Sequence, residues 1–394
     1  MTFPAEDFIA DRPRPSPLYI AAAGASVANI WTSVNGATTA RVYTDVEGEY
    51  AAALSGVGVV DASPLARYRV RGADAGRALN RLTTTPAARL KIGETAPGLL
   101  CDNAGRVVDI ADVARLAEDD FVLTLQRRRE MRLRACCEGL DAVHQPLNDA
   151  VAALAVLGPG GPALLKAAGF GADAGAFAET KTVKGVRATV KRMLIAGAPA
   201  VEIVFPADEA LLVWERLERA ALSAAAPRWI GLDALEALRI ENAVPRLGLD
   251  FDGAEDRGEG RARLPVEIGL GFLAPLDSAW YSGRAALRRA PSTRRRLVAA
   301  RAVAGRVARG AAAFVGGRPV GAATSTAYSP RLRSAVAMID LTIDPDASLQ
   351  DLRLAADRGD DGVVAVELGP ADRPEAQPFK REKPAEDRLA AVGR

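Results

Sequence analysis

The sequence predicts an α+β protein built from ferredoxin-like units and followed by a small C-terminal β-barrel. Three observations support this prediction. A chain of 394 residues is too long for one ordinary hydrophobic core, so two or three domains are expected. Strand-like and helix-like segments alternate within short spans, which favours α+β units over a doubly wound sheet. Beyond the arginine-rich segment 288–296, short apolar strands are punctuated by Gly-Gly and Ser-Pro, as in a β-barrel or β-sandwich.

The individual elements follow from apolar runs and from helical spacing. Strands are expected at residues 66–72, 107–116, 120–125, 152–158, 186–195 and 200–206. Helices are expected at residues 74–82, 127–140, 161–169 and 208–222. The last helix has a credible start, because acidic residues follow Pro206 near the positive end of the helix dipole. Residues 1–18 show no apolar period and are expected to form an extended lead.

A further helix is predicted from residue 231, because leucine and isoleucine recur at about 3.6-residue spacing. It breaks at Pro245, and the loop that follows carries Asp250. Arg239 and Glu241 lie in this apolar helix, where buried ions need partners. Two interpretations are open: a satisfied buried ion pair, or an arginine that holds an anionic ligand.

Bulk composition excludes several classes of protein. Hydrophobic residues make up 49% of the chain and charged residues 25%, as in soluble globular proteins. The 51 Lys and Arg residues nearly balance the 49 Asp and Glu residues, so no nucleic-acid partner is predicted. The apolar segment 19–31 is too short to span a bilayer and follows an acidic lead, so no membrane partner and a cytoplasmic location are expected. The tail 371–394 is rich in proline and charge and is expected to be mobile.

Few residues are available for metal or redox chemistry. Of the three cysteines, Cys136 and Cys137 are neighbours, so neither a disulfide framework nor a metal site is expected. The single histidine, His144, lies in a polar, turn-like segment and is predicted to be a surface or capping residue. Gly56-Val57-Gly58 has no third glycine opening a helix, so a dinucleotide-binding domain is not predicted.

Six blocks of sequence carry a resemblance to a known family. They include EYAAALSGVGVVDASPLARYRVRGADAGRALNRL, CDNAGRVVDIADVARL, LAVLGPGGPALL, GLDALEALRIENAVPRLGLD, PVEIGLGF with SGRAAL, and GGRPVGAATSTAYSPRLRSAVAMIDL. Their content and order resemble the glycine-cleavage T-protein (aminomethyltransferase) family over about residues 20–345. The resemblance implies a folate-binding region at residues 19–287, with about residues 56–150 as an inserted subdomain around a central folate cavity, and a β-barrel at residues 294–370.

The resemblance also implies roles for particular residues. Glu202, in AVEIVFP, occupies the place of the family glutamate that pairs with the amide-like edge of the pterin. Alternatively, this side chain points outward to water, as alternate strand residues do. Arg239 matches a family arginine near the folate tail or central pocket, and Asp102 and Tyr43 are further candidates for contact with tetrahydrofolate.

Asp109, in GRVVDIADV, takes the first place of an adjacent pair of aspartates in the family. The implied role is catalytic: a carboxylate near the transferred carbon stabilises developing positive charge or orients the folate N5 amine. The second place holds Ile110, and Asp112 is the alternative candidate.

The expected activity is tetrahydrofolate-dependent transfer of a methyl or aminomethyl group from a small methylated amine, sulfonium or methoxy compound. Ile110 at the second acidic place favours a demethylase or an accessory subunit over the glycine-cleavage subunit. The alternative is a folate-binding accessory protein or subunit without transfer activity. A partner oxidoreductase subunit is a further expectation.

Overall fold

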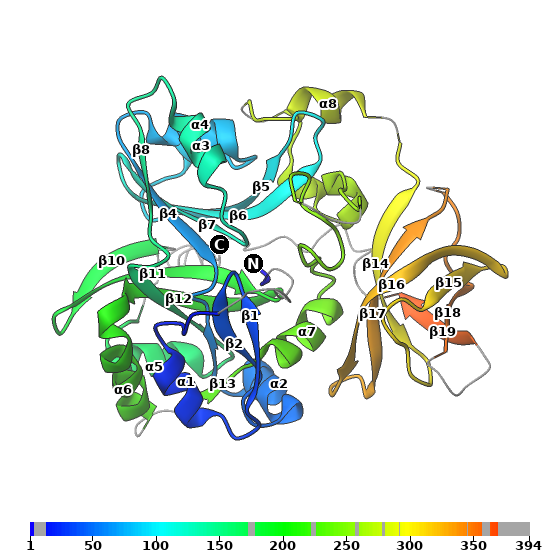
Figure 1. Ribbon diagram of the computed structural model, residues 1–394, viewed down its shortest axis with the longest axis horizontal. Coiled ribbons are helices and arrows are strands. Elements are labelled where there is room, and N and C mark those ends of the chain that lie inside the picture. The colour runs from blue at the N-terminus through cyan, green and yellow to red at the C-terminus, as the bar shows by residue number, and fades with distance from the viewer. Residues whose placement is uncertain are drawn as a thin grey trace, which may run out of the picture.

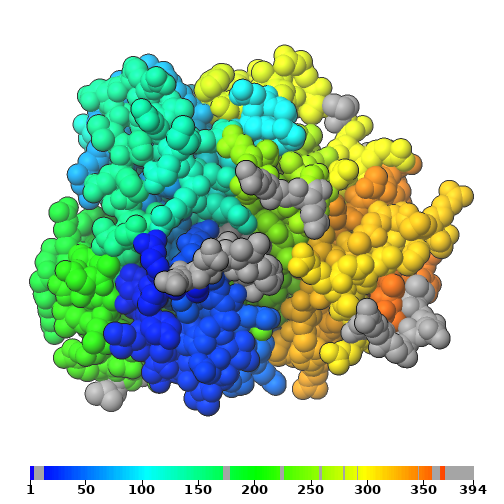
Figure 2. Space-filling model, in the orientation of Figure 1, coloured from blue at the N-terminus to red at the C-terminus, as the bar shows by residue number. Residues whose placement is uncertain are grey.

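The computed structural model describes residues 1–3, 13–171, 178–221, 226–256, 260–277, 280–290, 292–344, 346–356 and 363–368. Two α+β units lie one above the other, and a closed β-barrel packs beside them (Figure 1). The α+β class and the C-terminal barrel predicted from the sequence are therefore confirmed. The space-filling view shows the three bodies in close contact (Figure 2). The predicted mobile tail lies outside the described residues.

A six-stranded sheet forms the lower unit. Its strands, in spatial order, are β10 (Ala178–Val183), β11 (Val186–Ile195), β12 (Ala198–Pro206), β9 (Val151–Leu157), β3 (Gly58–Asp61) and β13 (Arg228–Trp229). All neighbouring pairs are antiparallel except β13 with β3, which fits an α+β fold and not a doubly wound sheet.

Helices cover both faces of the lower sheet, so a central strand such as β9 is apolar on both sides. One face packs against α1 (Tyr19–Ala25), α5 (Gly161–Ala168) and α6 (Ala210–Ala220). The other packs against α2 (Val46–Ser55) and α7 (Leu232–Glu241). Neighbouring residues of β9 show the alternation, since Leu154 joins the first core and Ala155 the second. The separate hairpin of β1 (Ile30–Val34) and β2 (Ala37–Val42) lies next to α7.

The turn between β11 and β12 fixes the register of these two strands. Ala196 and Gly197 both have positive φ, 52° and 82°, as a two-residue type I′ hairpin turn requires. The hairpin therefore places Lys191 directly opposite Glu202.

The upper unit is a five-stranded antiparallel sheet that the chain enters after β3 and leaves before β9. In spatial order its strands are β5 (Thr95–Cys101), β6 (Val107–Ala117), β7 (Asp120–Leu125), β4 (Ala66–Arg71) and β8 (Val143–Pro146). Helices α3 (Ala75–Leu82) and α4 (Glu130–Cys137) cover one face and share a core with it. The other face is turned toward the lower unit, where β6 contacts β10 and β5 contacts β11.

The barrel closes through six strands after α8 (Arg284–Arg289). Around the barrel they run β14 (Arg295–Ala302), β17 (Ser334–Thr342), β16 (Arg318–Ser329), β15 (Ala312–Val315), β18 (Leu352–Ala355) and β19 (Val363–Leu368). Helix α7 packs against β16 and β17, and Ile240 of α7 shares a core with Val336 and Met338. This helix therefore connects the lower unit to the barrel.

The predicted elements are all present, with some changes of length. The helix expected at residues 127–140 is shorter, Glu130–Cys137, and the one expected at 208–222 is α6 preceded by the short 3₁₀ turn Ala207–Glu209. Seven of the described strands were not predicted, because their sequences are short or rich in polar and turn-forming residues: β1, β2, β3, β5, β8, β10 and β13. Among the helices described, none is long and apolar enough to cross a membrane.

Candidate functional site

Buried charged side chains gather where the two sheets face each other. Lys191 of β11 is completely buried, and its Nζ donates to Asp112 Oδ1 of β6 at 2.7 Å and to Thr124 Oγ1 of β7 at 3.1 Å. The same Nζ lies 3.3 Å from Oε2 of Glu202 on β12. One lysine therefore links the lower sheet to the upper one by ionic contacts.

Glu202 lies between two cations. Nη2 of the fully buried Arg67 donates to Glu202 Oε1 at 2.5 Å, and the same guanidinium also donates to the carbonyls of Ala62 and Leu65. Burial acts to raise the pKa of Glu202, but Arg67 and Lys191 outweigh it and the pKa is lowered. Because Glu202 is fully buried, the alternative that it points outward to water is wrong. Its role toward the pterin stays a prediction.

Asp109 is also fully buried and makes four hydrogen bonds. Its carboxylate accepts from the backbone amides of Ile110, Gln126 and Arg127 at 2.8, 3.0 and 3.2 Å, and from Arg129 Nε at 2.9 Å. Burial raises the pKa of Asp109 to about 6, although Arg129 and the amides act in the opposite direction. Asp109 of β6 is thus fixed by hydrogen bonds from the residues that follow β7.

Residues 124–126, at the end of β7, contact the surroundings of both Asp109 and Glu202. Thr124 bonds Lys191, which contacts Glu202, while the amide of Gln126 bonds Asp109. Asp109 and Glu202 are therefore linked to neighbouring residues at the end of β7, 124 and 126, although they are 93 positions apart in the sequence and share no partner among the contacts described. The catalytic role of Asp109 stays a prediction.

The other predicted site residues lie elsewhere. Tyr43 packs between Trp31 and Trp229, with ring centroids 6.0 and 5.5 Å away, in the core on the α5–α6 side of the lower sheet. Asp102 lies in the turn between β5 and β6 and binds the backbone and side chain of Arg106, both at 2.8 Å. Neither belongs to the cluster around Asp109 and Glu202, and their cofactor-binding roles stay predictions.

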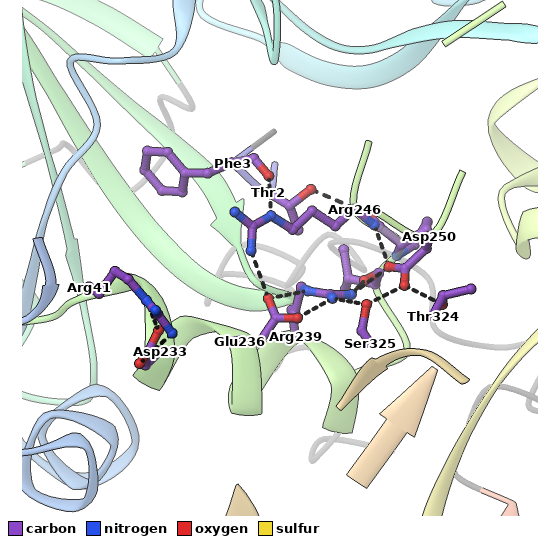
Figure 3. A network of polar contacts seen from close by, with 12 residues as sticks. Thr2, Phe3, Arg41, Asp233, Glu236, Arg239, Arg246, Asp250, Thr324 and Ser325 are labelled. Atoms are coloured by element: carbon purple, nitrogen blue, oxygen red, sulfur yellow. Dashed lines mark hydrogen bonds and ion pairs between the residues drawn. The ribbon is translucent and has the colours of Figure 1, made fainter. Parts of the chain in front are cut away.

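Arg239 of α7 is the centre of a second buried network (Figure 3). Its guanidinium donates to Asp250 Oδ2 at 2.7 Å, to Ser325 Oγ at 2.6 Å and to the carboxylate of Glu236. Only 2% of the residue is exposed. The structure thus agrees with the interpretation of Arg239 as part of a satisfied buried ion pair. The same network links α7 to strand β16 of the barrel. A role for Arg239 toward the folate tail stays a prediction.

Sequence reasoning missed Arg67, Lys191 and Gln126 as members of the central cluster. One signal was available for Lys191. A two-residue turn at 196–197 would have placed it opposite Glu202, and its side chain lies on the same strand face as Met193 and Ile195. A lysine on a buried strand face needs a buried partner.

The first three residues of the chain also lie at this junction (Figure 1). The amino group of Met1 donates to Leu194 O, and Thr2 Oγ1 donates to Pro245 O at 3.2 Å. Gln126 Nε2 donates to Thr2 Oγ1 at 2.7 Å, while Arg246 Nε donates to the carbonyl oxygen of Phe3 at 3.1 Å (Figure 3).

Beside these residues the central cavity is small, about 20 Å³. The residues that line it are Thr2, Phe3, Ile195, Ala196, Leu232, Leu235, Glu236, Arg239 and Arg246. Such a volume holds about one water molecule, whereas pockets for small-molecule ligands measure about 300–1,000 Å³. A reduced folate therefore does not fit this cavity, whose lining includes neither Asp109 nor Glu202, while Met1–Phe3 lies beside it. Among the described residues, no group of three or more His, Cys, Asp or Glu side chains is arranged to hold a metal ion.

Two stacked α+β units with buried carboxylates at their junction, followed by a small barrel, define the chain as a protein of the T-protein fold. Residues 20–277 match the family model described as the GCVT N-terminal domain. The chain therefore belongs to the glycine-cleavage T-protein (aminomethyltransferase) family.

Individual relatives agree with this assignment. A probable aminomethyltransferase of Halobacterium salinarum is 32% identical over 262 residues, which cover 64% of this chain and 69% of the relative. The alpha subunit of a sarcosine oxidase from Corynebacterium is 29% identical over 220 residues, 52% of this chain and 23% of that subunit. The crystal structure of the glycine cleavage system aminomethyltransferase T from Bartonella henselae superposes with a TM-score of 0.78, covering 91% of this chain and 97% of that one at 22% identity. This last likeness concerns the fold.

Proposed function

We propose that this protein is a tetrahydrofolate-dependent one-carbon transferase or demethylase. Its donor would be a small methylated amine, sulfonium or methoxy compound, and the transferred group a methyl or aminomethyl group. The observation that carries the proposal is that Asp109 and Glu202 are both fully buried near the junction of the two units and are linked through residues 124 and 126 at the end of β7. Family membership supports the choice of a folate as cofactor. A cytoplasmic location belongs to the same proposal.

The cluster presents Glu202 as a charged hydrogen-bond acceptor, which suits a ligand that carries donors. Glu202 is held in the charged form by Arg67 and Lys191, so it would meet a hydrogen-bond donor as a carboxylate. Its Oε2 has no hydrogen bond of good geometry in the described structure, which leaves that oxygen able to accept one. The cavity beside Met1–Phe3 is too small for a folate, so the proposal concerns a state in which Met1–Phe3 has moved.

Two measurements test the proposal. Calorimetry should show tetrahydrofolate binding to the wild-type protein, and chromatography should show 5-methyl- or 5,10-methylene-tetrahydrofolate formed from one of the three donor classes. Asp109→Asn should lower turnover by about 10²-fold, because a preorganised carboxylate acts chiefly where charge develops in the transition state. Absence of folate binding up to millimolar concentration would contradict the proposal.

A second candidate function has its own supporting observation. All four of the contacts of Asp109 are made to the protein itself, and its neighbour Ile110 supplies no second carboxylate. This arrangement favours a folate-binding accessory protein or subunit without transfer activity. The relative named as a subunit of sarcosine oxidase makes an oxidoreductase subunit the proposed partner class. Folate binding without turnover on any of the three donor classes would select this candidate.

A further inference from the structure

We infer that Met1–Phe3 is an internal occupant of the ligand site, and that a ligand enters by displacing it. The identity of the ligand as a reduced folate rests on the proposed function, whereas the occupancy rests on contacts alone. Thr2 and Phe3 are each only 4% exposed, so they are part of the interior and not a surface lead.

The three residues are held from both units and from the segment after α7. Gln126 reaches Thr2 from the upper sheet, Leu194 accepts from Met1 at the end of β11, and Pro245 and Arg246 bind Thr2 and Phe3. Phe3 also shares the core that β9, β11, α2 and α7 form on one face of the lower sheet. A segment held in this way fills the junction as a bound peptide would.

The bonds that Met1–Phe3 makes describe the ligand that would replace it. If the segment left, the carbonyls of Leu194 and Pro245 would lose donors, and the Gln126 side-chain amide and the Ala196 backbone amide would lose acceptors. Leaving such groups buried and unpaired is unfavourable, so a ligand must supply both kinds of partner. The apolar walls would accept a ring in the place of Phe3; they come from Ile195, Leu232 and Leu235.

One polar atom points to a ligand independently. Gln126 Oε1 is buried and has no hydrogen-bond partner in the described structure, although its Nε2 is bonded to Thr2. A buried carbonyl oxygen without a donor is uncommon in proteins. A planar heteroaromatic group that carries both donors and acceptors along one edge, such as the pterin of a reduced folate, would satisfy it together with the groups that Met1–Phe3 now binds.

An internal occupant weakens the apparent affinity for a ligand, because only the fraction of molecules with an open site can bind. Phe3→Ala removes the buried ring and should shift the molecules toward the open site. The apparent Kd for 5-formyltetrahydrofolate, measured by calorimetry on the full chain, should therefore fall by about tenfold or more. Phe272→Ala is the matched control, because Phe272 is 60% exposed and should leave the Kd within about twofold of wild type.

A second experiment measures the solvent accessibility of the segment directly. The three native cysteines are buried, so a Thr2→Cys thiol can be followed by its rate of reaction with a maleimide. It should react at least ten times more slowly than the thiol of Thr180→Cys, which lies on the exposed side of β10, and 5-formyltetrahydrofolate should accelerate it.

The two proposals fail in different ways. If the Thr2→Cys thiol reacts as fast in the native protein as in urea, Met1–Phe3 is not an internal occupant, whatever the folate result. Another outcome is that folate binds to the wild-type protein without changing the reaction rate of the Thr2→Cys thiol, and with the same Kd in Phe3→Ala. In that case displacement is wrong and the proposed function stands. If neither wild type nor Phe3→Ala binds folate while the thiol is protected, occupancy stands and the proposed cofactor is wrong.

Discussion

Replacing Lys191 by methionine should destabilise the protein strongly, because it unbalances a buried cluster of charges. The cluster consists of two cations, Arg67 and Lys191, and two carboxylates, Asp112 and Glu202, so it is neutral as a whole. Methionine keeps much of the apolar stem but removes the positive charge. Among the hydrogen bonds described, Glu202 would then retain that from Arg67, and Asp112 those from the hydroxyl of Thr95, 3.2 and 3.3 Å from its two oxygens.

Removing one partner of a buried ion pair typically costs about 3–5 kcal/mol, and Lys191 contacts two carboxylates. We therefore expect Lys191→Met to lower the free energy of unfolding by about 3–5 kcal/mol. Adding Asp112→Asn restores neutrality, so the double variant should be more stable than Lys191→Met by at least about 1 kcal/mol.

Urea unfolding followed by tryptophan fluorescence suits this measurement, because Trp31, Trp214 and Trp229 lie in or beside the core of the same unit. Lys166→Met is the matched control: Lys166 is exposed on α5, and its replacement should change the free energy by no more than about 0.5 kcal/mol. A Lys191→Met variant within 1 kcal/mol of wild type at an unchanged denaturant slope would refute the reasoning.

Three further predictions concern the other buried ions. The pKa of Asp109 is raised from 3.8 to about 6 in the folded state, so the folded protein binds this proton more tightly than the unfolded chain does. The stability of wild type relative to Asp109→Asn should therefore fall by about 3 kcal/mol as the pH rises from about 4 to about 6, measured by urea unfolding across that range. Glu202 has a lowered pKa, so the sign reverses: stability of wild type relative to Glu202→Gln should be greatest above pH 4.5 and decline as the pH is lowered below it, and a flat difference would show that Arg67 and Lys191 do not hold the charge. Arg239→Met should cost about 3–5 kcal/mol in thermal or urea unfolding, since it removes the buried cation of Asp250 and leaves Glu236 with Arg246; an effect below 1 kcal/mol would mean that α7 is held to the barrel by apolar contacts alone.

The buried carboxylates of the central site could be anticipated from local sequence, but the ion pairs that they form could not. Asp109 and Glu202 stand out as acids in apolar strands, and a resemblance to known proteins places both near one centre. Which cations meet them depends on strands of two different sheets. Arg67 belongs to the upper sheet and Glu202 to the lower, and no periodicity within either segment indicates that they touch. Tyr43 shows the reverse case, because its aromatic neighbours Trp31 and Trp229 occupy a core away from that cluster.

The sequence by itself determined the fold class and most of the elements. Alternation of period two specifies strands that are apolar on one or both faces, helical spacing specifies α7, and glycine-bearing turns specify hairpins, since each of these depends on a few neighbouring residues. The tertiary structure alone decided that Arg239 is satisfied within the protein and that Met1–Phe3 lies among residues 126, 194 and 245–246. These outcomes depend on the shape left between separately folded sheets and on which buried polar groups still need partners there, and both quantities arise only when distant parts of the chain are packed together.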